Sequence, residues 1–82
     1  MSVSQLEDGT IVLEGVCPIE DAEPLLRLLS SGPGAVVDWR ECDGAHTAIV
    51  QLLMASGARL QGPPRGRFLD RFVGPALRGS QT

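Results

Sequence analysis

The sequence is poor in aromatic residues, and this scarcity limits the ligands that it can bind. Of its 82 residues only Trp39, Phe68 and Phe72 are aromatic, and tyrosine is absent. Proteins that bind single-stranded nucleic acid stack the bases on aromatic rings. Residues 1–58 also carry nine acidic residues against two arginines, an excess that repels phosphate groups. We therefore expect no nucleic-acid partner.

Cysteines and long apolar runs are also scarce. Cys17 and Cys42 are too few for a disulfide scaffold, and Cys42 and His46 lack the spacing of a zinc-finger half-site. No apolar run approaches the roughly 20 residues that span a bilayer, and we recognise no signal peptide. These absences predict a cytoplasmic protein with free thiols, no metal, no other cofactor and no segment inserted in a membrane.

The residues that are present suit one small domain. The hydrophobic share of 43% is enough for a core, and we expect a single domain over residues 1–82, with the core at about 3–77 and a flexible tail at 78–82. Residues 59–82 carry five arginines and one acid. Such a basic end either steers an acidic partner or forms a solvated helix surface.

The first part of the chain predicts a hairpin of two strands. Residues 3–7 alternate apolar and polar side chains, and residues 10–16 are rich in β-branched residues. Between them stands Asp8-Gly9, a strong hairpin signal because glycine adopts positive φ without steric cost. The first two elements are therefore expected to pair as antiparallel strands.

Helix and strand patterns then alternate. Asp21 is the expected N-cap of a helix that runs to about Leu29, because this start places Pro24 in the first turn, where its missing N–H is tolerated. Residues 30–34 predict a loop and residues 35–39 a central strand. The polar residues 40–45, which include a glycine, predict a connecting loop.

The second half repeats this alternation. Residues 47–55 are almost wholly apolar and predict a buried helix that ends at Ser56-Gly57. Residues 58–61 resume strand alternation. A last helix, which the Gly74-Pro75 pair is expected to fray, would place five apolar side chains on one face: Phe68, Leu69, Phe72, Val73 and Leu77.

The order β-β-α-β-α-β-α predicts an α/β fold. Strands that alternate with helices form right-handed crossovers and a mostly parallel sheet. The expected architecture is one four-stranded sheet, packed by helices, with the antiparallel N-terminal hairpin at its edge.

This element order resembles the STAS family of anti-sigma-factor antagonists over about residues 3–77. Leu13-Glu14-Gly15 is similar to the Leu-x-Gly that ends a family strand, and residues 21–26 resemble the start of the first STAS helix. Residues 36–40 followed by 46–53 resemble the family's strand, loop and hydrophobic helix. The resemblance implies a regulatory protein-interaction module rather than an enzyme.

The same resemblance supplies candidate site residues. Thr47 falls on the phosphorylatable Ser/Thr of the STAS motif and Ala48 on the small residue that follows, whereas His46 stands where the motif has Asp and Ile49 where it has Gly. From the residues alone, Thr47 is equally an ordinary helix N-cap. The candidate partner-binding residues are Glu41, Asp43, His46, Thr47, Ala48 and Gln51.

The sequence leaves three functions open. In the first, the chain is a STAS-like partner switch that docks on a kinase-type anti-sigma factor, a phosphatase or a larger complex. Alternatively it is a small STAS subunit that binds the permease or ATPase of a phospholipid-type ABC transporter. The remote third alternative is a thiol-dependent hydrolase that uses Cys17 or Cys42 with His46.

Overall fold

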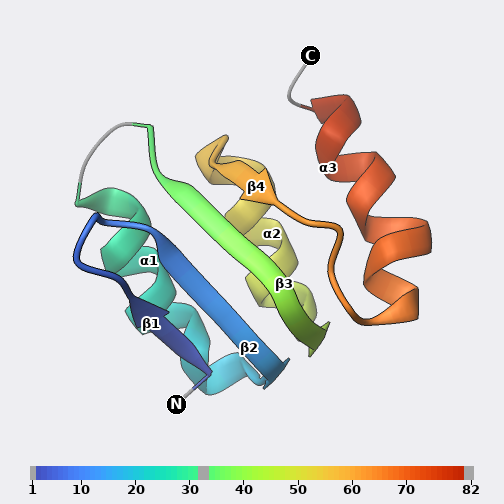
Figure 1. Ribbon diagram of the computed structural model, residues 1–82, viewed down its shortest axis with the longest axis horizontal. Coiled ribbons are helices and arrows are strands. Elements are labelled where there is room, and N and C mark those ends of the chain that lie inside the picture. Colours follow the sequence, from blue (N-terminus) through green and yellow to red (C-terminus); the bar gives the residue numbers. More distant parts are fainter. Residues whose placement is uncertain (1, 32–33, 81–82) are drawn as a thin grey trace.

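A four-stranded sheet forms one layer of the structure, and two helices cover one of its faces (Figure 1). The computed structural model describes residues 2–31 and 34–80. The elements in chain order are β1 (Val3–Gln5), β2 (Ile11–Cys17), the 3-10 turn η1 (Ile19–Asp21), α1 (Ala22–Ser30), β3 (Val36–Ala45), α2 (Thr47–Ser56), β4 (Arg59–Gln61), the π-helical turn η2 (Leu69–Val73) and α3 (Gly74–Ser80).

The strands follow one another across the sheet in the order β1-β2-β3-β4. The first pair is antiparallel, and the other two pairs are parallel. Each right-handed crossover therefore advances one strand in the same direction, which places successive helices on the same face. Figure 1 shows α1 and α2 behind the sheet, whose front is uncovered. The predicted α/β class, with a mostly parallel sheet and an antiparallel N-terminal hairpin, is confirmed.

The turn between β1 and β2 depends on a glycine. Gly9 has a φ of 95°, and its N–H donates to the carbonyl of Leu6 at 3.0 Å. The Asp8 carboxylate accepts a hydrogen bond from the Thr10 N–H at 2.9 Å, which holds the pKa of Asp8 below its usual value. The Asp8-Gly9 hairpin is therefore confirmed, although β1 ends two residues before the end of the expected strand 3–7.

The core lies between the sheet and the two helices behind it. Alternate residues of β2 and β3 are buried, as expected for strands with one covered face. Each large apolar side chain buried here stabilises the fold by about 1.5–3 kcal/mol relative to an exposed one. The main contributors are Ile11, Leu13, Val37 and Trp39 from the strands and Leu25, Ile49 and Leu53 from the helices.

The start of α1 follows from its proline. Asp21 is the N-cap residue and Pro24 is the third helical residue, where a missing backbone N–H leaves no hydrogen bond unmade. The predicted helix start is confirmed. The Asp21 side chain itself makes no capping hydrogen bond.

The strand β3 is longer than the sequence predicts. Residues 40–45, the expected loop, continue β3 to Ala45 and pair with β2, with two irregularities in register. Cys42 is fully buried while Glu41 and Asp43 are exposed. Their polarity reflects the uncovered face of the sheet and not a loop, so the loop prediction is wrong.

The C-terminal helix also differs from the prediction. The Gly74 N–H donates to the carbonyl of Leu69, five residues earlier, and this wide π-type turn precedes Pro75. The helix therefore continues past the Gly74-Pro75 pair instead of fraying there. Leu69 and Leu77 are buried, but Phe68 and Phe72 are exposed, so the predicted single apolar face is wrong for the two phenylalanines.

The helix α3 includes residues 78–80, which belong to the expected tail, while residues 81–82 lie outside the described residues. Residues 32–33 of the expected loop 30–34 also lie outside them. Among the described residues, no helix is both long and apolar enough to cross a membrane.

The segment that follows β4 lies in close contact with the C-terminal half of β3. The Gly66 N–H donates to the carbonyl of Cys42 at 2.9 Å. A Cβ atom on Gly66 would lie 2.0 Å from the backbone oxygen of Asp43, and one on Gly62 would lie 2.4 Å from Nε1 of Trp39. Glycine at these positions permits the close approach.

We expect Gly66→Ala to lower the free energy of unfolding by more than about 2 kcal/mol, because the new methyl group collides with the backbone of β3. Gly44→Ala is the matched control. Its Cβ would make only ordinary contacts of 3.9 Å with Val16, and the expected change is within about 0.5 kcal/mol. Urea denaturation measures both, and equal stability of the two variants would contradict the close approach.

Candidate functional site

The candidate site lies where β3 leads into α2. Parallel strands of α/β proteins commonly present binding residues at their carboxyl ends. Here the ends of β2 and β3 are joined, because the His46 N–H donates to the carbonyl of Cys17 at 2.9 Å. The first turn of α2 therefore begins at a defined position at the end of the sheet.

His46 is the N-cap of α2. Its ψ of 150° is non-helical, and its Nδ1 accepts a hydrogen bond from the Ala48 N–H at 3.0 Å. The alternative that Thr47 caps the helix is wrong, because Thr47 is the first helical residue. His46, which the sequence suggested as a partner-binding residue, thus also has a structural role.

Thr47 is exposed, and its hydroxyl makes no hydrogen bond within the described part of the chain. Gln51, one turn further along α2, is exposed as well, and Ala48 is half-buried. Residues four apart lie on the same side of a helix. Thr47 and Gln51 therefore form one polar stripe at the start of α2.

The structure does not bring Glu41 and Asp43 into this group. They lie on the uncovered face of the sheet, where Arg65 Nη1 contacts Glu41 Oε2 at 2.9 Å and Arg65 Nε contacts Asp43 Oδ1 at 2.7 Å. The hydrogen bonds from Arg65 hold the pKa of Asp43 below its usual value. Both carboxylates hold the segment after β4, and α2 lies behind the sheet.

An apolar groove between α1 and α2 was missed by the sequence analysis. The helix α2 was predicted to be buried, but among its residues only Ile49 and Leu53 are buried. Its outward side and that of α1 enclose a cavity of about 220 Å³, beside which Leu26 is 49% exposed. The cavity is lined by Leu26, Leu29, Ser30, Leu52, Ala55 and Ser56.

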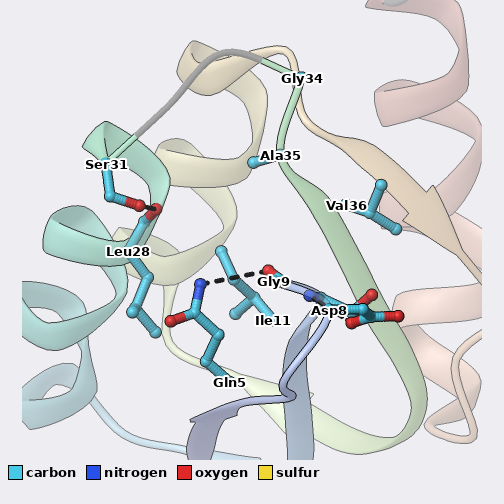
Figure 2. Close-up of a pocket in the computed structure, with 10 residues that line it drawn as sticks. Gln5, Asp8, Gly9, Ile11, Leu28, Ser31, Gly34, Ala35 and Val36 are labelled. Carbon is cyan, nitrogen blue, oxygen red and sulfur yellow. Dashed lines mark hydrogen bonds between the residues drawn. The ribbon is translucent and has the colours of Figure 1, made fainter.

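A second cavity, of about 240 Å³, lies where β2 and β3 begin and α1 ends (Figure 2). Its polar groups already have partners: Gln5 Nε2 donates to the carbonyl of Gly9 at 3.2 Å, and the Ser31 hydroxyl donates to that of Leu28 at 2.8 Å. Thr10 and Ser31 contribute hydroxyl groups to its lining, and the Thr10 side chain hydrogen-bonds the Asp8 carboxylate. We assign no function to it.

The two cysteines are part of the hydrophobic core. Both are fully buried and free, and Cys42 Sγ donates to the carbonyl of Gly44 at 3.3 Å. A hydrogen bond with Cys42 and burial raise the pKa of the Cys17 thiol, and the negative charge of Asp21 adds to this shift. Among the described residues, no group of His, Cys, Asp and Glu side chains is arranged to hold a metal ion.

Comparison of the chain with models of protein families, with curated proteins and with solved structures found no match. The resemblance to the STAS family therefore stays a prediction from the sequence. We base the functional proposal on the fold and on the geometry at the start of α2.

We expect His46→Ala to lower the free energy of unfolding by about 1 kcal/mol, because the Ala48 N–H loses its acceptor. His46→Asn keeps an acceptor at the cap and should stay within about 0.5 kcal/mol of the parent. Urea denaturation followed by circular dichroism compares the two. An equal loss in both variants would show that the imidazole stabilises α2 by another contact.

We expect both thiols of the folded chain to react with a soluble aromatic disulfide at least about 100-fold more slowly than those of the urea-unfolded chain at neutral pH. Burial keeps the reagent away, and the raised pKa keeps Cys17 protonated. The release of the coloured thiol measures the rate. Rapid modification of one cysteine in the folded chain would revive the thiol-dependent hydrolase.

Proposed function

We propose that this chain is a non-catalytic, cytoplasmic protein-interaction module of the STAS type, which docks on its partner through the start of α2 and is switched by phosphorylation of Thr47. The observation that carries the proposal is the exposed Thr47 hydroxyl, which makes no hydrogen bond among the described residues at the first position of a helix. An acceptor hydroxyl must be accessible in this way to a kinase.

The helix terminus suits a phosphate chemically. The first turn of α2 contains no acidic residue, so a phosphate there would meet the positive end of the helix dipole without a like charge on the same turn. Phosphorylation adds about −1.5 to −2 charges at neutral pH. Such a charge beside Gln51 would change which surfaces can approach α2.

The two departures from the STAS motif are compatible with this role. His46 caps α2 through Nδ1, the task that the carboxylate of the motif's Asp can perform. Ile49 is fully buried, so its branched side chain points into the core and away from the Thr47 hydroxyl. Neither substitution blocks the start of the helix.

The apolar groove extends the contact surface. Leu52 and Ala55 follow Gln51 along α2 and line the groove with Leu26 of α1. A partner that covers the Thr47 stripe could bury these side chains as well, which supplies the apolar centre that stable interfaces need. A kinase-type anti-sigma factor or a phosphatase is the partner class that the proposal favours.

A non-catalytic role agrees with the chemistry near the site. The Nδ1 atom of His46 is engaged with the Ala48 N–H, and both thiols are buried. A nucleophile needs a base within hydrogen-bond reach and access to substrate. The arrangement supplies a docking surface more readily than a reaction centre.

We expect the chain isolated from its native host to carry one phosphoryl group in a fraction of molecules, located on Thr47 by fragmentation of the intact protein. Thr47→Ala should abolish this mass shift. Thr10→Ala is the control and should leave it unchanged, since Thr10 lies in the β1–β2 turn. Phosphorylation confined to another residue, or none under any growth condition, would contradict the switch.

The same variants test the docking surface. Thr47→Glu should weaken the recovered partner's affinity at least about tenfold, whereas Thr47→Ser should not. A glutamate at this position interacts favourably with the helix dipole, so unfolding cannot explain the loss. Recovery of a permease or ATPase would assign the module to a transporter instead. Unchanged affinity of Thr47→Glu would contradict docking at this position.

A further inference from the structure

The segment 67–72 contains an arginine–phenylalanine pair twice, four residues apart. This spacing places like side chains on the same side of a helix. Leu69 is buried and anchors the segment, whereas Phe68 and Phe72 are 67% and 63% exposed, with ring centroids 5.3 Å apart. Two adjacent aromatic rings therefore stand uncovered on the outward side of η2.

The arginines of the two pairs are also free to bind a partner. Arg67 and Arg71 are exposed, and neither forms an ion pair within the described residues. Arg27, Arg40 and Arg65, by contrast, are each paired with carboxylates. We call Arg67, Phe68, Arg71 and Phe72 the arginine–phenylalanine face.

A segment of opposite charge, residues 14–20, leads from the end of β2 into η1. Val16 and Ile19 are 68% and 53% exposed, and Glu14 and Glu20 flank them in sequence. Neither glutamate has an ion-pair partner in the described part of the chain. We call these four residues the acid–aliphatic face. It belongs to β2 and η1, which Figure 1 shows on the other side of β3 from η2 and α3.

We propose that these two faces bind each other in trans, so that the arginine–phenylalanine face of one copy of the chain docks on the acid–aliphatic face of a second copy. Two arginines meet two glutamates, and two rings meet two aliphatic side chains. Such complementary pairing provides both attraction and register. The contact is independent of Thr47 and of the proposed function.

A second copy fits the charge distribution better than an anionic membrane does. The same arginines would be attracted to anionic lipid headgroups. Residues 1–58, however, carry nine acidic residues and two arginines, and a negative surface repels them. In self-association these acids supply the attraction. Faces of four residues are small, so the contact is weak and sensitive to salt.

Sedimentation velocity of the full chain tests the proposal. At low ionic strength, between about 10 μM and about 1 mM, the weight-average mass should rise above the 8.7 kDa of one chain. It should return toward 8.7 kDa in about 1 M salt, where the Debye length is about 3 Å. A single 8.7 kDa species at every concentration would overturn the proposal.

Charge reversal tests which faces meet. The double variants Arg67→Glu/Arg71→Glu and Glu14→Arg/Glu20→Arg should each weaken self-association at least about tenfold. Mixing the two should restore association between them, because their unchanged faces are complementary and their two reversed faces are complementary as well. A mixture that stays monomeric would refute the pairing of these two faces.

Further variants separate this contact from other surfaces. Phe68→Ser/Phe72→Ser should abolish association, whereas the controls Arg59→Glu and Glu7→Arg, which reverse charges outside both faces, should not. Thr47→Glu should also leave it unchanged. Loss of association in Leu26→Ser, which alters the apolar groove, would overturn the proposal, as would a monomeric chain that binds vesicles of anionic phospholipid.

Discussion

The pairing of β2 with β3 is the contact on which the other parts of the molecule depend. It extends from Ile11–Val37 to Cys17–Ala45, and β4 pairs with the opposite edge of β3. On one face of β3, the side chains of Val37, Trp39 and Cys42 are buried against the helices. On the other face its carboxylates hold Arg65. A change in this register would displace both layers together.

The order of the strands explains why one face of the sheet is uncovered. The chain adds β2, β3 and β4 one after another, and right-handed crossovers then place α1 and α2 on the same side. An uncovered face of a sheet commonly carries polar side chains. Ion pairs such as Arg40–Asp38 and Arg65–Asp43 occupy this face. Residues 40–45 are therefore polar although they form a strand and not a loop.

The candidate site was only partly predictable. The start of α2 and the position of Thr47 follow from the change of pattern along the sequence. The capping role of His46 does not, because it depends on the backbone conformation that brings Nδ1 to the Ala48 N–H. Glu41 and Asp43 are expected at the site because they lie close to Thr47 in the sequence. Their partner Arg65 is 24 and 22 residues away, a contact that no local pattern reveals.

The sequence by itself determined the features that local backbone preferences control: the Asp8-Gly9 turn, the helix start before Pro24, the end of α2 at Gly57 and the order of the elements. Only the tertiary structure decided which apolar side chains are covered. In the last helix two stripes with the same four-residue spacing are both apolar. Contacts with the rest of the protein bury Leu69 in one stripe, while Phe68 in the other remains exposed. Burial depends on neighbours that are distant in sequence, and periodicity alone cannot choose between equal stripes.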